Sequence, residues 1–158
     1  MNIGSILHFP EFVFRNGTSK SKFFIVIYFK DDDFLLYSLP TSQQYISGSL
    51  KTEGCNNHEL PNGGYISMYF FPSGKIIGVN GFKFSKDTFC SFSKGLLKAN
   101  QEKINAMSFS LIDSMLNREF LDLLICIKHS RNLQNAYVEF VDKLIDNLEN
   151  LTISKDLF

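Results

Sequence analysis

The spacing of apolar residues changes once along the chain, and this change limits the folds that the sequence can form. Up to about residue 95, apolar residues occur in short aromatic or β-branched segments separated by turn residues, a pattern typical of strands. After about residue 100, apolar residues recur every three or four positions, as on one face of a helix. Strands followed by helices predict an α+β fold.

The strand-rich part contains one strong hairpin pattern. Residues 23–29 are nearly all apolar, which predicts a central strand buried on both faces, as in a small, strongly bent antiparallel barrel. Residues 31–33 then form a turn, and residues 34–39 return as the partner strand. Further strands are expected at residues 4–9, 65–71, 75–79 and 81–84.

The rest of the chain divides into a polar stretch and two helices. Residues 51–64 are polar and rich in turn-forming residues, so we expect a surface loop there. An apolar stripe predicts a first helix at about 111–129, and Ser130 can cap a second helix after it. These helices should pack on each other or cover one side of the sheet.

Length and composition exclude several classes of protein. The 158 residues suit one domain, and 44% hydrophobic and 15% aromatic residues are enough to form a core, so intrinsic disorder is excluded. The formal net charge of zero lacks the strongly basic signature of a protein that wraps duplex nucleic acid. We expect a single domain over residues 1–158, with a barrel over about 1–100 and a helical extension over about 105–158 packed on it.

The cysteines and the apolar runs bear on location. Cys55, Cys90 and Cys126 are odd in number and widely spaced, without a CxxC motif, which predicts neither a disulfide framework nor a zinc site. No run approaches the roughly 18 apolar residues of a membrane helix, and no charged leader precedes an apolar stretch at the start. We therefore expect a cytoplasmic protein that does not engage a membrane.

Few residues form a pattern that carries chemistry by itself. His58, in the polar stretch, can act as a general acid or base, although an isolated loop histidine is more often a plain surface residue. Asp31, Asp32 and Asp33 lack the Gly and distal Glu of a calcium loop, so we expect a solvated turn and no metal. The chain has no Walker loop, GxSxG elbow or HExxH motif.

Four features of the first 50 residues occur in a definite order. They are a Gly4-Ser5-Ile6 start, a loop containing Gly17 and Lys20, a basic residue, Lys22, that opens a buried strand, and a strand ending in Leu39-Pro40-Thr41-Ser42. In this order they resemble the PemK/MazF family, the toxins of bacterial toxin–antitoxin pairs. That family places a Gly-x-Ile/Val strand first, a long loop and an Arg-Pro strand start next, and a Thr-Ser pair after the third strand.

The resemblance implies a fold, an activity and partners. It implies an SH3-like barrel, a homodimer, and an endoribonuclease that cleaves single-stranded RNA without metal or cofactor, leaves a 2′,3′-cyclic phosphate and is neutralised by a cognate antitoxin. Lys22 would stabilise the charge on the attacked phosphate and Thr41 would hydrogen-bond that phosphate, because the ends of the two paired strands meet at one sheet edge. Five further residues would contact RNA: Arg15, Lys20, Ser42, Gln43 and His58.

The departures from the family leave other readings open. Lys22-Phe23 stands where the family has Arg-Pro, and lysine lacks the planar fork that arginine offers a phosphate. The chain can therefore be a catalytically degenerate barrel that binds RNA or protein. It can also be an interaction protein that uses its acidic amphipathic helices. Lys22 can be a solvated charge at a strand start, and Thr41-Ser42 can simply begin a turn.

Overall fold

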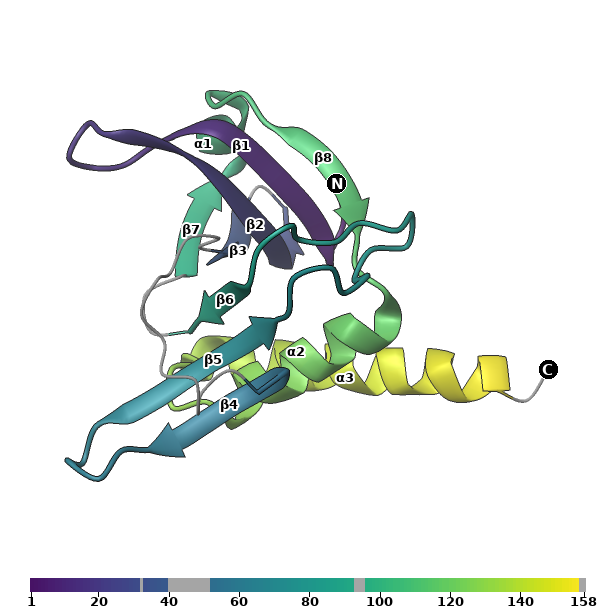
Figure 1. Cartoon of the computed structure of the whole chain (residues 1–158). Coiled ribbons are helices and arrows are strands. Elements are labelled where there is room, and N and C mark those ends of the chain that lie inside the picture. The colour runs from purple at the N-terminus through teal and green to yellow at the C-terminus, as the bar shows by residue number, and fades with distance from the viewer. Residues whose placement is uncertain (32, 40–51, 93–95, 157–158) are drawn as a thin grey trace.

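The computed structural model describes residues 1–31, 33–39, 52–92 and 96–156 of the chain (Figure 1). The strands are β1 (Ser5–Val13), β2 (Ser19–Lys30), β3 (Asp33–Leu39), β4 (Gly54–Glu59), β5 (Tyr65–Phe71), β6 (Thr88–Ser91), β7 (Leu96–Asn100) and β8 (Ser110–Ser114). The helices are α1 (Gln101–Asn105), α2 (Asn117–His129) and α3 (Asn135–Asp156). Among the described residues seven strands precede the first helix, and the expected α+β class is confirmed.

The strands form two antiparallel sheets. The larger sheet has five strands in the order β7-β3-β2-β1-β8, and the smaller has three in the order β4-β5-β6. The larger sheet curves around the short helix α1 (Figure 1). Within the described ranges β7 and β8 stand at the two edges of this sheet, so the strands there do not close into the expected barrel.

Strand β2 lies in the middle of the larger sheet and is buried on both faces, as the sequence predicts. Ile25 and Ile27 belong to the core that includes the buried residues of α2 and α3. Phe24 and Val26 face a second core, inside the bend of the sheet, with Phe9 and the buried Ile104 of α1. The β2–β3 hairpin is also confirmed, since Phe23 pairs with Leu39 and Lys30 with Asp33.

Helix α2 links the two sheets and the C-terminal helix. Its apolar stripe includes Phe120, Leu123, Leu124 and Ile127, all of which are buried. The helix packs against α3 and against β4 and β5, below the larger sheet in Figure 1. The predicted contact between the two helices is therefore confirmed. No helix of the described part of the chain is long and apolar enough to cross a membrane.

Two predictions for the helical part are wrong in detail. The first helix begins at Asn117 rather than near residue 111, because residues Ser110–Ser114 form β8 and pair with β1. Backbone pairing with an available strand edge here prevails over apolar spacing typical of a helix. Ser130 ends α2 instead of beginning α3, and its hydroxyl donates to the carbonyl of Ile127 at 2.6 Å.

The polar stretch also differs from the prediction of a surface loop. Residues Gly54–Glu59 form strand β4, and every one of them pairs with β5. Only Asn56 of β4 is fully buried, so this edge strand needs no apolar residues of its own. The polar segment is extended because its backbone pairs with β5.

A buried carboxylate organises residues 74–84, where two strands were predicted. Within the described ranges only two isolated bridges involve this segment, Ile76 to Lys83 and Gly78 to Met115. The Asp113 side chain, 5% exposed, accepts hydrogen bonds from the backbone N–H groups of Asn80 (3.0 Å), Phe82 (3.2 Å) and Ser114 (2.7 Å). Burial alone would raise the pKa of Asp113, but these hydrogen bonds outweigh it and hold the pKa below its ordinary value. Asp113 therefore holds the segment as a compact loop.

Replacing Asp113 by Asn tests this role. The variant keeps the size of the side chain but turns an NH₂ group toward backbone donors, so we expect it to lose about 2 kcal/mol of unfolding free energy at pH 7. The wild-type advantage should shrink below about pH 4, because the folded pKa is lowered and the stabilisation is lost as the carboxylate takes up a proton. Urea unfolding at pH 7 and pH 3 measures both effects, with the exposed Asp146→Asn as control. Equal stabilities at pH 7 would contradict the assignment.

Candidate functional site

The candidate cations Lys20 and Lys22 lie on the inner face of the curved sheet. Lys22 pairs with Phe9 and Lys20 with Phe12, across the β1–β2 ladder. Because side chains alternate along a strand, both lysines share the face of Phe24, which belongs to the core inside the bend. The sequence thus places two charges at the open end of an apolar surface.

Lys22 is partly buried in an aromatic environment. Its Nζ lies 5.8 Å from the centre of the Phe14 ring, at the distance of a cation–π contact. Burial lowers the pKa of Lys22, and the nearby charge of Lys20 lowers it further. A partly desolvated ammonium group interacts with an anion more strongly than one in bulk water. Lys22 is therefore well placed to hold a phosphate.

A tight turn follows β1 and carries Arg15. The backbone N–H of Phe14 donates to the carbonyl of Thr18 at 2.8 Å, and the Asn16 side chain accepts from the Thr18 N–H at 3.1 Å. Gly17 has a φ of 80°, which glycine adopts at little cost. The long first loop of the PemK/MazF pattern is therefore replaced by a hairpin turn, and it leaves Arg15 exposed.

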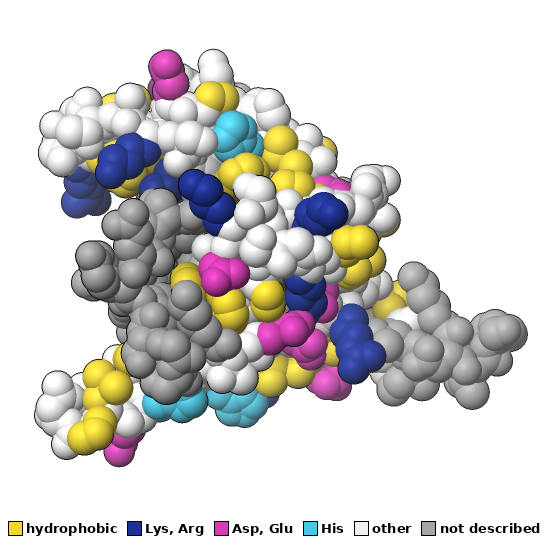
Figure 2. Space-filling view, viewed as in Figure 1, with side chains coloured by type: hydrophobic (Ala, Val, Ile, Leu, Met, Phe, Trp, Pro, Cys, Tyr) yellow, Lys and Arg dark blue, Asp and Glu magenta, His cyan; other side chains and the backbone are white. Residues whose placement is uncertain are grey.

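In the described part of the chain, the cations of this region have no carboxylate partners. Elsewhere, Lys75, Lys128, Arg131 and Lys143 form ion pairs with Asp or Glu side chains. Arg15, Lys20, Lys22 and Lys103 form none with any residue in the described ranges. Figure 2 shows Lys and Arg side chains gathered beneath the β1–β2 hairpin, at the upper left of the view. This surface can accept an anion without breaking an ion pair.

The remaining predicted residues divide into two groups. Thr41, Ser42 and Gln43 lie outside the described residues. The expectation that the strand ends meet is nevertheless confirmed for the part described, because Leu39 at the end of β3 pairs with Phe23, the neighbour of Lys22. His58 is exposed on β4 of the smaller sheet and pairs there with Ile66, so it is not on the sheet that carries Lys22.

A cleft beside the turn contains residues that sequence reasoning missed. Its volume is about 540 Å³, and it is lined by Phe14 and Arg15, by Lys98 of β7, by Lys103 of α1, and by Asn132 and Gln134 between α2 and α3. These segments are far apart in the sequence, and no motif connects them. The clue available in the sequence was the pair Lys98 and Lys103 flanking the start of the helical part.

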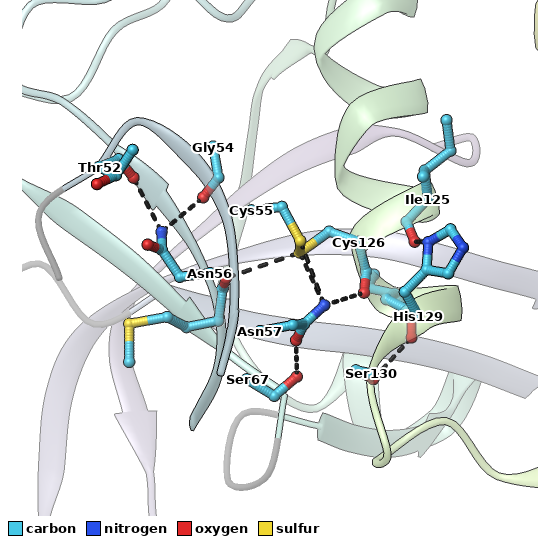
Figure 3. Close-up of a disulfide and its surroundings, with 12 residues drawn as sticks. Thr52, Gly54, Cys55, Asn56, Asn57, Ser67, Ile125, Cys126, His129 and Ser130 are labelled. Carbon is cyan, nitrogen blue, oxygen red and sulfur yellow. Dashed lines mark hydrogen bonds between the residues drawn. A yellow bond between two sulfur atoms is a disulfide. The ribbon is translucent and has the colours of Figure 1, made fainter. Parts of the chain in front are cut away.

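A disulfide joins the smaller sheet to α2, contrary to the sequence prediction. Cys55 of β4 and Cys126 of α2 are bonded, with an S–S distance of 2.07 Å. The Asn57 amide points at this bond, donates to the carbonyl of Cys126 at 3.2 Å and accepts from the Ser67 hydroxyl at 2.5 Å (Figure 3). Wide spacing in the sequence hid the pairing, since only the packing of α2 against β4 brings the two cysteines together. A cytoplasmic location stays a prediction. Because Cys55 and Cys126 are bonded to each other, the cysteines do not support it.

The described ranges contain no group of three or more His, Cys, Asp or Glu side chains that could hold a metal ion. No family model, no characterised protein and no solved structure matches the chain. The likeness to the PemK/MazF family thus rests on the order of its N-terminal residues alone.

Replacing Lys22 by Met tests the environment of this side chain. Because the folded pKa is lowered, the charge opposes folding at neutral pH, and this penalty is relieved as pH rises toward about 10.5, the ordinary lysine value. We expect the thermal midpoint of Lys22→Met at pH 7.5 to equal or exceed that of the wild type, with a smaller difference at pH 10. The control Lys143→Met should lower the midpoint slightly, since Lys143 is paired with Glu139. A clear loss of stability in Lys22→Met would refute the prediction.

Breaking the disulfide tests its contribution to stability. In the chain-entropy model, a cross-link between cysteines separated by 71 positions stabilises the fold by about 4 kcal/mol. The double variant Cys55→Ser/Cys126→Ser should lose a large part of this in urea unfolding. Dithiothreitol should lower the wild type to the same stability and leave the double variant unchanged. If dithiothreitol left the urea midpoint of the wild type unchanged, the proposed contribution of the disulfide to stability would be contradicted.

Proposed function

We propose that the chain is a metal-independent endoribonuclease of the PemK/MazF type that cleaves single-stranded RNA. The observation that carries the proposal is Lys22, a partly buried cation on a strand that pairs with the end of β3. Among the residues that the structure describes, Lys22 has no carboxylate partner. Thr41 and Ser42 follow that strand end by two and three residues. In the sequence, a pair of hydroxyl residues thus follows the strand that pairs with the one carrying Lys22.

The proposed reaction is an in-line attack of a ribose 2′-hydroxyl on the adjacent phosphorus. The P–O2′ bond forms as the 2′-hydroxyl gives its proton to water, and the P–O5′ bond breaks as the 5′-oxygen takes up a proton, which leaves a 2′,3′-cyclic phosphate and a 5′-hydroxyl. Lys22 stabilises the negative charge that develops on the phosphate oxygens, and Thr41 donates a hydrogen bond to them. A lowered pKa also makes the Lys22 ammonium a better proton donor to the leaving 5′-oxygen.

The proposal includes a fold, partners and a location. The proposed fold is SH3-like; the strong curvature of the five-stranded sheet supports it, although β7 and β8 do not pair with each other in the described ranges. Arg15 and Lys20, which form no ion pair with a described residue, support contacts with the RNA backbone. Ser42, Gln43 and His58 complete the proposed RNA contacts. A homodimer, a neutralising antitoxin and a cytoplasmic location belong to the proposal through the family likeness.

A noncatalytic binding module is the second candidate. It is favoured by the lysine at position 22, which presents a single charged nitrogen where the family has a bidentate guanidinium. In this case the same cationic surface binds RNA and no bond is broken.

Cleavage of a mixed-sequence single-stranded RNA in excess chelator tests the proposal. The wild type should produce discrete fragments ending in cyclic phosphate. Thr41→Ala and Lys22→Ala should each lower the rate by about 100-fold or more, because each removes a group that stabilises the transition state. Thr41→Ser, which keeps the hydroxyl, should retain activity.

The variant Lys22→Arg separates the two candidates. If the wild type is inactive and Lys22→Arg creates cleavage, the chain is a degenerate relative that binds RNA. If Thr41→Ala cleaves as fast as the wild type, Thr41 has no part in the mechanism. A folded wild type and a folded Lys22→Arg variant that both leave the RNA intact would refute the ribonuclease.

A further inference from the structure

The cleft beside the β1–β2 turn combines three kinds of side chain. Phe14 supplies an aromatic wall, with Phe12 packed edge-on against it at 5.3 Å between ring centres. Arg15, Lys98 and Lys103 supply positive charge, and no Asp or Glu is among the lining residues. Its volume, about 540 Å³, lies in the range of small-molecule sites, about 300–1,000 Å³.

Its cations differ in how freely they can bind a ligand. Lys98 is held in place, because its Nζ donates to Oε1 of Gln134 at 3.0 Å and lies 5.2 Å from the centre of the Tyr137 ring. Arg15 and Lys103 are exposed and form no ion pair with any residue of the described ranges. Two unpaired cations on separate segments suit a ligand with more than one phosphate position.

The polar residues of the cleft suit the edge of a base. The bond from Lys98 occupies the Gln134 oxygen and leaves the Gln134 amide N–H groups to donate to a ligand. The Asn132 side chain adds both a donor and an acceptor. An aromatic face, side-chain amides and cations together are the features that bind a nucleotide of a single strand.

We propose that this cleft binds one nucleotide of single-stranded RNA next to the phosphate held by Lys22. The base stacks on Phe14, the amides of Asn132 and Gln134 contact its edge, and Arg15 and Lys103 bind the flanking phosphates. Phe14 lies between the cleft and the phosphate proposed at Lys22, because the centre of its ring is 5.8 Å from Nζ of Lys22. The inference rests on the proposed function only in taking RNA as the ligand, since it requires no bond to be broken.

Binding of a 2′-O-methyl RNA tests the site separately from cleavage, because this RNA has no free 2′-hydroxyl to attack phosphorus. The probe is a fluorescein-labelled, mixed-sequence 12-mer, measured by fluorescence anisotropy over a range of salt concentrations. Arg15→Met and Lys103→Met should each weaken binding by roughly three- to ten-fold and reduce the slope of log K against log salt by about 1. Phe14→Leu keeps an apolar side chain but removes the ring, and should weaken binding by about five-fold or more.

Lys143→Met, on the exposed face of α3, is the matched charge control and should bind as the wild type does. Thermal unfolding checks that each variant is folded. If Phe14→Leu does not fold, the binding result for Lys103→Met decides the test. Folded Arg15→Met and Lys103→Met variants that bind like the wild type would overturn the proposal. So would displacement of the probe by a mononucleotide at micromolar concentration, which would indicate a site for free nucleotides instead.

The outcomes for binding and cleavage are distinguishable. Probe binding that depends on Lys103 and Arg15, without cleavage of ordinary RNA, supports the cleft and refutes the ribonuclease. Cleavage by the wild type with unaltered KM in both cleft variants refutes the cleft and leaves the ribonuclease standing.

Discussion

Burial of strand β2 on both faces is the constraint on which the rest of the structure depends. Alternate side chains of one strand belong to two separate cores, one shared with α2 and α3 and the other enclosed by the bend of the sheet. A strand of this kind must have a neighbour on each edge and a covering layer on each face, because its backbone groups need partners and its side chains are apolar. β1 and β3 supply the neighbours, and the helices and the curvature of the sheet supply the two layers.

The proposed site lies where this strand stops being fully buried. Toward its N-terminal end the inner face changes from Phe24 to Lys22 and Lys20, so the apolar core ends in two charges that form no ion pair with the described residues. The lowered pKa of Lys22 reflects the cost of this position, since burial disfavours the charged form. A lysine that served solubility alone would not need a partly buried position. Lys143 and Lys128, on the helices, are instead paired with carboxylates near the surface. Placing a cation at some cost to stability is typical of functional sites.

Other features hold the elements around this site in place. Asp113 fixes the loop at residues 78–82 against β8, and Gly78 is needed there because a Cβ would contact the Asp113 carboxylate and lie 2.7 Å from Cβ of Phe82. The Cys55–Cys126 bond ties the smaller sheet to α2, which also packs against α3. The turn between α2 and α3 then brings Asn132 and Gln134 to the cleft. The cleft therefore depends on packing that lies well away from it.

The sequence by itself determined the elements with a strong local pattern: the doubly buried strand, the β2–β3 hairpin, the strand at Tyr65–Phe71 and the apolar stripes of both long helices. It also singled out Lys22, Lys20 and Arg15, which lie close together along the chain. Only the tertiary structure decided that polar residues Gly54–Glu59 and mixed residues Ser110–Ser114 become strands, because ladder hydrogen bonds come from a partner strand and leave no periodic trace in the segment itself. The same holds for the disulfide and for the cleft. Their residues belong to segments distant in sequence. The packing of α2 against β4 brings the two cysteines together, and the cleft forms where β7, α1 and the turn between α2 and α3 lie beside the β1–β2 turn.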